Sequence, residues 1–467
     1  LPISAGSGKT SVALHRIAYL LYRDHRLNYN NILILSPNDV FSDYISDVLP
    51  ELGETNVLKT TFSDFAQTFL KPYKNIESYA EFLERMYSTN NYDKKNIKYK
   101  MSDKYKEDID SYFEKIDDKI SFNESIKQYD LEVTNEELLY LYAIKYKKFS
   151  FKERIDLLIS DICLKLHLSY KKYYNEIKNK LLRISNISLN IFDLYEDFLN
   201  EYNLKEERKS KRINYEDITP LVYIYFKVNG YPIYNDIKQV VIDEAQDYTY
   251  FQLEVLKTIF KNTSFTILGD VNQIINPYYT YDSLKELSAL FENSNYLELS
   301  KTYRSSEEII EYSNQILGIN NACAVRRNNN IPVKVINIEE SDLSNIIKDD
   351  INNIKYNNNF RRIAIITKNI NVAKKVHKLL NDSSVQLLTK SEDSLNSDVI
   401  IIPSYLAKGL EFDAVIAYND VNETYTEEEG KLYYVVCTRA QHQLNVYNEP
   451  RQLIRKWNNI WILQSII

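Results

Sequence analysis

The sequence predicts an α/β protein with parallel sheets, in which two α/β domains enclose an inserted all-helical domain. Short all-apolar runs alternate with helical patterns near both ends of the chain, which is the rhythm of βαβ units. A glycine-containing loop at the start leads directly into a helical pattern. Residues 71–212 contain no glycine, are rich in Lys, Glu, Asp and Tyr, and carry apolar residues at helical spacing. We therefore expect the first α/β domain at 1–70 and 213–300, the insertion at 71–212 and the second α/β domain at 301–467.

Bulk composition narrows the class of protein. The 467 residues are 44% hydrophobic and 26% charged, as in a folded globular protein of about three domains. The net charge of −7 argues against a generally basic nucleic-acid-binding surface but permits a local basic groove. Cys163, Cys323 and Cys437 are odd in number and far apart, which predicts a reduced protein without disulfide partners. With no apolar run of membrane-spanning length and no visible signal peptide, we expect a cytoplasmic location.

The first ten residues have the pattern of a phosphate-binding loop. The segment Ala5–Thr10 reads A-G-S-G-K-T and precedes an amphipathic helical pattern. Gly6 and Gly8 allow successive backbone N–H groups to point at an anion on the helix N-terminus. Lys9 would reach the terminal phosphates, and the Thr10 hydroxyl would bind Mg²⁺. The alternative is a Gly-Ser turn that caps an ordinary helix.

The start of the chain departs from the complete phosphate-loop pattern. That pattern requires a glycine where Ile3 stands, and it follows a β-strand, whereas two residues precede Ile3. We therefore expect that the sequence is truncated at its N-terminus and that the strand carrying the loop lies outside it.

The remainder of the first α/β domain follows in order. Ile32–Leu35 is expected to be a buried parallel strand, and the segment after Thr60 is expected to open a helix at Ser63 or Asp64. A further helix is expected from Tyr215 to Asn229, where Gly230 would end it.

Two acidic residues follow the next predicted strand, Val240–Ile242. Acids at the carboxyl end of a parallel strand lie where α/β sheets bind their ligands. Asp243 would hold Mg²⁺ together with Thr10, and Glu244 would orient and deprotonate an attacking water. A strand at Phe265–Leu268 then leads to Gln273, which is placed to sense a terminal phosphate.

The second α/β domain is predicted from four apolar runs and three polar residues. Arg304 precedes a helix that Ser305 and Glu308 are expected to cap as a capping box. Glu411 offers a carboxylate to a ribose hydroxyl, and Arg439 offers a guanidinium to developing phosphate charge. The four predicted strands are Val333–Ile336, Ile363–Ile366, Val399–Ile402 and Val415–Ala417.

Together, these six segments resemble the motifs of superfamily 1 helicases of the UvrD/Rep class in order and residue type. The resemblance implies two RecA-like domains with ATP and Mg²⁺ between them, and an ATPase activity. It implies that Lys9, Thr10, Asp243 and Glu244 serve phosphate, metal and water, and that Gln273, Arg304 and Arg439 close on the γ-phosphate. The full set of predicted ATP-binding residues is Gly6, Ser7, Gly8, Lys9, Thr10, Ser11, Gly409 and Glu411.

Three features differ from a standard DNA helicase of this class. The segment Ile274–Tyr278 lacks the aromatic-Arg-Gly pattern with which those helicases stack single-stranded bases, and only 99 residues separate Arg304 from Pro403. The segments Ser11–Tyr22 and Ile402–Asp413 are similar to those of the HelD, or helicase-IV-like, family. That resemblance implies an ATPase that binds bacterial RNA polymerase and releases it from nucleic acid.

Three functions follow from these observations. The preferred hypothesis is an ATPase that remodels RNA polymerase, with DNA or RNA as further possible ligands and no membrane partner. The second is a 3′-to-5′ DNA helicase or translocase in DNA repair. The third is a truncated paralogue that only binds a partner.

Overall fold

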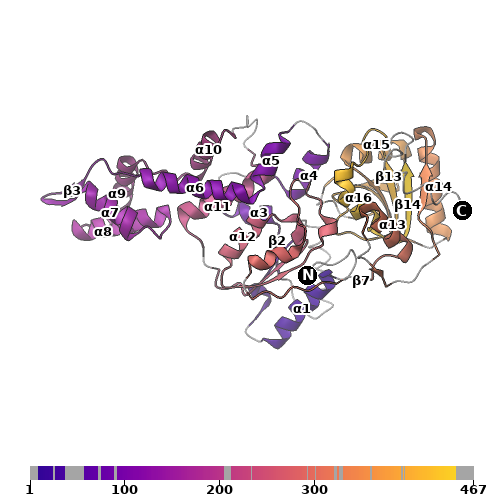
Figure 1. Ribbon diagram of the computed structural model, residues 1–467, viewed down its shortest axis with the longest axis horizontal. Coiled ribbons are helices and arrows are strands. Elements are labelled where there is room, and N and C mark those ends of the chain that lie inside the picture. Colours follow the sequence, from indigo (N-terminus) through magenta and orange to yellow (C-terminus); the bar gives the residue numbers. More distant parts are fainter. Residues whose placement is uncertain are drawn as a thin grey trace.

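The computed structural model describes fourteen stretches of the chain. The molecule is elongated, with a helical arm at one end, a central sheet in the middle and a second sheet at the other end (Figure 1). At residues 9–11, 14 and 357 only the helical backbone is described. The described residues are 9–24, 27–36, 57–71, 75–88, 92–204, 212–232, 234–291, 293–299, 301–319, 323–325, 330–357, 360–390, 393 and 395–448.

The central sheet is parallel, with the strand order β2-β1-β5-β6. Its strands are β1 (Ile32–Leu35), β2 (Leu58–Thr60), β5 (Gln239–Ile242) and β6 (Ser264–Ile267). Every residue of β1 and β5 is buried, as expected for strands covered on both faces. Helix α1 (Lys9–Arg23) packs on one face, while α3 (Phe62–Gln67), α11 (Tyr215–Asn229) and α12 (Tyr250–Ile259) contribute to the core on the other. The predicted strands of this sheet are confirmed.

One predicted helix start is wrong by one or two residues. Helix α3 begins at Phe62 and is capped by Thr61, whose hydroxyl oxygen accepts a hydrogen bond from the backbone N–H of Asp64. The same hydroxyl donates to the Asp64 carboxylate at 2.7 Å. Asp64 therefore supports the cap from the third helical position and is not the cap itself.

The second sheet is also parallel, with the strand order β11-β12-β10-β13-β14-β9. Helices α14 (Glu340–Asn357) and α15 (Ile370–Leu380) pack on one face, and α13 (Glu307–Leu317) and α16 (Gly430–Cys437) pack on the other. All four predicted strands are present, whereas β11 and β14 were missed. The strands are β9 (Lys334–Asn337), β10 (Ile363–Thr367), β11 (Val385–Leu387), β12 (Val399–Pro403), β13 (Phe412–Asn419) and β14 (Ala440–Asn448).

Between the two halves of the central sheet lies a long insertion, whose residues 103–201 form the arm on the left of Figure 1 and whose residues 79–100 lie between the arm and the second sheet. It is helical except for one antiparallel hairpin, β3 (Ile126–Gln128) and β4 (Leu131–Val133), so the expected all-helical insertion differs in this detail. Tyr129 takes a left-handed conformation (φ 53°) in the two-residue turn. The helical elements are α4 (Tyr79–Ser88), α5 (Lys94–Lys100), α6 (Asp103–Lys119), α7 (Asn135–Tyr140), the π-helix η2 (Leu141–Lys145), α8 (Phe151–Lys165), α9 (Tyr170–Ser185) and α10 (Ile191–Glu201).

The two ends of the arm meet at its base. The Glu77 N–H donates to the Ile213 carbonyl at 2.9 Å, and the Ile213 N–H donates to the Asn75 carbonyl at 3.0 Å. Beside this bridge the Arg85 guanidinium binds the Glu77 carboxylate through Nε and Nη2, and Nη2 also lies 2.6 Å from Glu216 Oε2 on α11. Burial and the neighbouring Asp217 raise the pKa of Glu216 to about 7, against the opposing effect of Arg85.

We expect Arg85→Met to lower the free energy of unfolding by about 3 kcal/mol at pH 8, because it leaves two buried carboxylates without their cation. The loss should be smaller at pH 5.5. The folded-state pKa of Glu216 lies above its unfolded value, so ionisation of Glu216 opposes folding increasingly from pH 4.5 to about 7. At pH 5.5, which is below the folded-state pKa, Glu216 is mostly protonated in the folded protein, and Arg85 has less charge to neutralise. Urea unfolding of the parent protein and the variant, followed by fluorescence at pH 8 and pH 5.5, measures the loss in free energy of unfolding.

The matched control for this experiment is Arg183→Met, because Arg183 is exposed on α9 and lies 3.8 Å from an exposed glutamate. Such a surface pair contributes at most about 1 kcal/mol. Equal losses for the two variants at pH 8 would contradict the role of Arg85.

Candidate functional site

The carboxyl ends of β5 and β6 deliver the acidic residues of the site. Asp243 follows β5 directly and is almost fully buried, and its Oδ1 accepts a hydrogen bond from the Glu244 N–H at 2.8 Å. Glu244 lies in the left-handed region (φ 51°), which turns the chain sharply before the short helix Ala245–Asp247. For a non-glycine residue this conformation is uncommon and is concentrated at functional sites.

Gln246 joins the two strand ends. Its Nε2 donates to Glu244 Oε2 at 2.6 Å, and its Oε1 accepts from the Asp270 N–H at 2.9 Å. Gly269 makes this approach possible, because a Cβ there would lie 2.7 Å from Gln246 Oε1. The side chain of Glu244 is therefore held in one orientation by a neighbour that is itself hydrogen-bonded.

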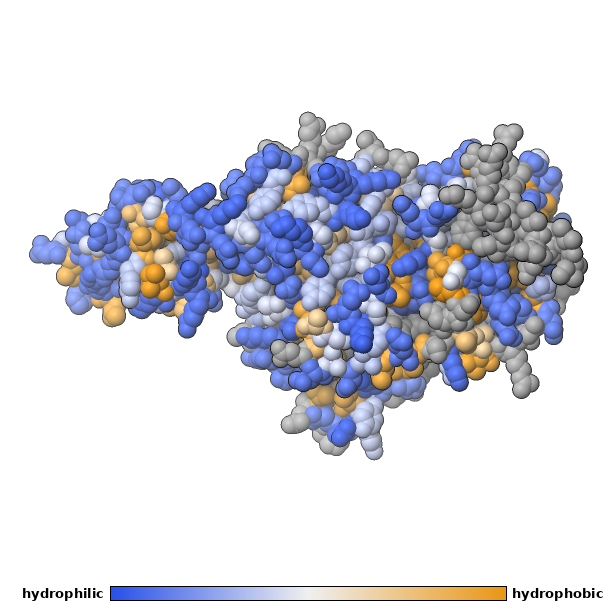
Figure 2. All heavy atoms as spheres, viewed as in Figure 1, coloured by the Kyte–Doolittle hydropathy of each residue, from blue (hydrophilic) through white to orange (hydrophobic). Residues whose placement is uncertain are grey.

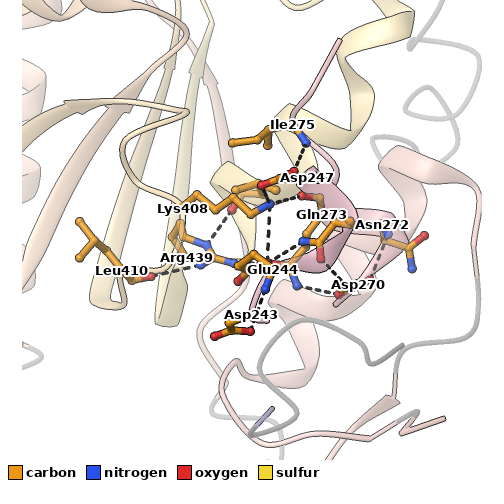
Figure 3. Close-up of polar contacts among 12 residues, drawn as sticks. Asp243, Glu244, Asp247, Asp270, Asn272, Gln273, Ile275, Lys408, Leu410 and Arg439 are labelled. Atoms are coloured by element: carbon orange, nitrogen blue, oxygen red, sulfur yellow. Dashed lines mark hydrogen bonds and ion pairs between the residues drawn. The ribbon is translucent and has the colours of Figure 1, made fainter. Parts of the chain in front are cut away.

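Lys408 reaches the site from the loop after β12 of the second sheet (Figure 3). Its ammonium group lies 2.5 Å from Asp247 Oδ2 and 3.6 Å from Glu244 Oε2, and it donates to the Gln273 carbonyl at 2.8 Å. Burial raises the pKa of Asp247, although Lys408 opposes this shift. Lys408 thus compensates buried negative charge on the central sheet.

Arg439 makes the second link between the sheets. Its Nη2 donates to Gln273 Oε1 at 2.6 Å, and Gln273 Nε2 donates to Asp270 Oδ2 at 2.6 Å (Figure 3). The guanidinium is buried between the sheets and also contacts the carbonyls of Val435 and Leu410. Burial, followed by repulsion from Arg304, lowers the pKa of Arg439 to about 10, so the side chain remains charged at neutral pH.

Arg304 and Glu411 form an ion pair beside Arg439. Arg304 Nη2 lies 2.6 Å from Glu411 Oε1, and Gln441 donates to Glu411 Oε2 at 2.6 Å. Burial alone would raise the pKa of Glu411, but Arg304, Gln441 and Arg439 outweigh burial and lower it. Gly409, which has a φ of 87°, makes the left-handed turn between Lys408 and this pair.

The helix that follows Arg304 is capped differently from the prediction. Helix α13 begins at Glu307 with Ser306 as its N-cap residue, and the Ser305 hydroxyl donates instead to the Ala440 carbonyl at 2.6 Å. The expected capping box of Ser305 and Glu308 is therefore wrong, because β14 offers Ser305 a competing acceptor.

The predicted phosphate loop lies mostly outside the described residues. This applies to Gly6, Ser7 and Gly8, while for Lys9, Thr10 and Ser11 only the helical backbone of α1 is described. Of the predicted magnesium pair, Asp243 fits, because a buried carboxylate at a strand end is a hard oxygen ligand of the kind Mg²⁺ prefers. The described residues contain no group of three or more His, Cys, Asp or Glu side chains placed to hold a metal ion, so Asp243 stands without a preformed protein ligand set.

The structure thus brings Glu244, Gln273 and Arg439 together, with Arg304 and Glu411 at their side. Sequence reasoning missed Gln246, Asp247 and Lys408 as site residues. Gln246 and Asp247 stand two and three positions after the predicted Glu244, and Lys408 stands directly before the predicted Gly409. Their adjacency to these residues was the available signal. Their partners, however, come from other strand ends or from the other sheet.

Comparisons with known proteins identify the family of both α/β domains. The UvrD/REP helicase N-terminal domain matches residues 3–281, and the UvrD-like helicase C-terminal domain matches residues 377–448. The chain is similar to three proteins described as DNA helicases. It is 22% identical over 323 residues to the probable DNA helicase II homolog of Mycoplasma capricolum, and the match covers 67% of this chain and 38% of that protein.

The other two relatives differ in coverage. The ATP-dependent DNA helicase srs2 of Schizosaccharomyces pombe is 24% identical over 319 residues, which cover 67% of this chain and 32% of that protein. The probable DNA helicase of Mycoplasma pneumoniae is 21% identical over 500 residues, which cover 97% of this chain and 82% of that protein. The matched region thus spans about a third of the length of srs2 and of the M. capricolum protein.

None of these three names mentions RNA polymerase, and the expected closeness to the HelD family gains no support from them. Within the described part of the chain, no helix is both long and apolar enough to span a membrane. The matched domains cover more than half of the sequence, with the whole central sheet and strands β11, β12, β13 and β14 of the second sheet. The chain therefore belongs to the UvrD/REP helicase family.

Proposed function

We propose that this chain is an ATP-driven motor that translocates on single-stranded DNA and separates duplexes. Its motor domains would be residues 1–70 with 213–300 and residues 301–467. The main support is the set of hydrogen bonds from Lys408 and Arg439 to the residues after β5 and β6, because they place charges from both sheets around one point. The geometry of such a site changes when the two sheets move relative to one another. A nucleotide-driven motor requires this coupling between its site and the placement of its domains.

The roles of the residues follow from their positions. Asp243, together with Thr10, would hold Mg²⁺, which neutralises phosphate charge when bound. Glu244 would accept the proton of the attacking water in the orientation that Gln246 imposes. Arg439 and Arg304 would stabilise the charge that develops on the transferred phosphoryl group, and Glu411 would bind the ribose.

A cleft of about 470 Å³ next to this site supports DNA as the track. Its walls come from α4, the loop after Gln273 and the second-sheet segment from Asn422 to Leu432. Although the loop lacks the expected stacking pattern, the fold brings Tyr87, Tyr92 and Tyr278 into the walls with Lys94 and Lys431. Tyrosine faces and lysine charges are the groups that bind single strands without sequence preference.

The same cleft is connected to the hydrolysis residues by hydrogen bonds. The Ile275 N–H donates to Asp247 Oδ1 at 3.3 Å, and the Ile275 carbonyl accepts from the Tyr87 hydroxyl at 2.7 Å. A bound DNA strand that shifts Tyr87 or the loop at Ile275 would therefore also shift the surroundings of Asp247 and of its partner Lys408.

RNA polymerase is the second candidate partner. The observation that favours it is the acidic character of one cleft wall, where Glu423, Glu428 and Glu429 would oppose a phosphate backbone. Unwinding of a 3′-tailed duplex by the purified protein would support the DNA proposal. Release of stalled RNA polymerase from DNA by nucleotide, without any unwinding, would favour the polymerase alternative.

Glu244→Gln tests the proposed base. Because glutamine cannot take up the proton, we expect ATP turnover to fall by about 10²- to 10⁴-fold, whereas the nucleotide dissociation constant changes less than threefold. Steady-state phosphate release and equilibrium binding of a fluorescent ATP analogue measure these two quantities. Turnover at the parent rate would assign the base to another residue.

Arg439→Ala tests charge stabilisation from the second sheet. Arginines that stabilise a transferring phosphoryl group contribute roughly 10³- to 10⁵-fold in rate, so we expect a loss within that range. The control is Arg361→Ala, because Arg361 is exposed just before β10 of the same sheet. A large loss of nucleotide affinity with little loss of rate would instead make Arg439 a ground-state ligand.

Tyr278→Ala tests the cleft. Removing one stacking ring should weaken oligo(dT) binding by about 5- to 100-fold, since a stacked base contributes ~1–3 kcal/mol. DNA-stimulated ATPase activity should show the same shift in its half-saturating DNA concentration. Fluorescence anisotropy measures binding, with Tyr356→Ala as the control, because Tyr356 is exposed at the end of α14. Equal oligo(dT) affinities for the two variants would place the bound DNA strand outside this cleft.

A further inference from the structure

The outer end of the arm exposes large apolar side chains that its own core does not use. Leu139, Tyr140, Ile144 and Leu164 are 38%, 58%, 66% and 78% exposed, and we refer to these four residues as the arm-tip patch. The same elements already bury Leu138, Tyr142 and Ile162 inside the arm. Single exposed apolar residues are ordinary, whereas a group of them on one projecting element is typical of an interaction site.

Two ion pairs join the helical elements that carry the arm-tip patch. Lys145 on η2 lies 2.8 Å from Asp161 on α8, and Lys165 on α8 lies 2.5 Å from Glu137 on α7. In the sequence, Tyr140 and Ile144 lie between the paired residues Glu137 and Lys145. Leu164 lies between their partners Asp161 and Lys165 on α8. Figure 2 shows apolar surface on the outer end of the arm, over α7 and α8.

The backbone at the patch is also unusual. Leu141–Lys145 forms a π-helix directly after α7, and such turns are rare and are frequently found at functional sites. Ile144 lies within this segment and Tyr140 directly precedes it.

The segment that carries the patch has a net charge opposite to that of the whole protein. Residues 135–185 carry eleven Lys and Arg but only six Asp and Glu, whereas the chain as a whole carries 58 against 65. Lys147, Lys148, Lys171 and Lys172 are exposed. A partner that buries the arm-tip patch would therefore be favoured by carboxylates around its own apolar residues.

We propose that the arm-tip patch docks a protein whose surface combines apolar side chains with Asp and Glu. Duplex DNA would satisfy the lysines, but phosphate contacts are made by cations, hydroxyls and backbone N–H groups, and leave no role for exposed Leu139, Ile144 and Leu164. The patch lies far from the cleft along the arm (Figure 1), so this docking is separate from the translocation proposed above.

The test uses a library of 20-residue helical peptides with Leu, Ile or Phe at positions i, i+3, i+4 and i+7 and Asp or Glu elsewhere. A second library carries Lys in place of the acids. We expect the full chain to select members of the acidic library and none of the basic one. We expect the double variant Ile144→Ser, Leu164→Ser to bind the selected peptides at least about 30-fold more weakly, since buried apolar anchors contribute ~2 kcal/mol or more.

Leu395→Ser is the matched control, because Leu395 is 49% exposed in the loop before β12 and lies outside the arm. It should leave peptide binding unchanged, and circular dichroism checks that all variants fold. No selection, equal selection of both libraries, or equal binding by the double variant would overturn the proposal. So would a patch-dependent loss of 20-bp duplex DNA binding or of self-association in sedimentation, which would assign the patch to DNA or to a second copy. Oligo(dT)-stimulated ATPase activity should be unchanged in the double variant, which separates this test from that of the motor function.

Discussion

The site depends on burying two cations of one sheet against polar groups of the other. Lys408 and Arg439 come from the second sheet, yet their closest partners, Asp247 and Gln273, follow strands of the central sheet. A charge removed from water is strongly unfavourable unless it is paired and hydrogen-bonded, so these contacts admit few relative placements of the two sheets. Glu244 acquires a defined electrostatic environment only in such a placement.

The same contacts extend beyond the residues proposed for hydrolysis. The Asp247 carboxylate accepts a hydrogen bond from the Ile275 N–H, and the Ile275 carbonyl accepts one from the Tyr87 hydroxyl. The Tyr87 carbonyl in turn accepts a hydrogen bond from Nδ2 of Asn369, which caps the start of α15. The ring of Tyr87 also stacks on Tyr405 with an angle of 9° between the planes. Helix α4 therefore contacts both sheets at the wall of the cleft, which provides a contiguous route between the strand proposed there and the proposed ATP site.

The arm divides into a base and an outer end with different physical character. At the base, Arg85, Glu77 and Glu216 are paired and largely buried, which fixes the arm to the central sheet. At the outer end the surface is basic and partly apolar, and the short elements α7, η2 and α8 present it away from the motor. Such a division allows an arm to contact a partner without disturbing the cleft.

The sequence alone determined the α/β class, most parallel strands, the helix Tyr215–Asn229 and the positions of Glu244, Gln273 and Arg439, because these depend on local apolar runs and short motifs. It did not predict β14, because the first residues of this strand include Gln441–Gln443 and form no apolar run. It also did not predict Ser306 as the N-cap residue of α13, because the Ser305 hydroxyl is bonded to the Ala440 carbonyl instead of capping the helix. Only the tertiary structure showed that Lys408 pairs with Asp247, that tyrosines from α4 and from the loop after Gln273 line one cleft, and that apolar residues gather at the end of the arm. These pairings join residues far apart in the chain, and local propensity carries no information about a partner that only folding brings near.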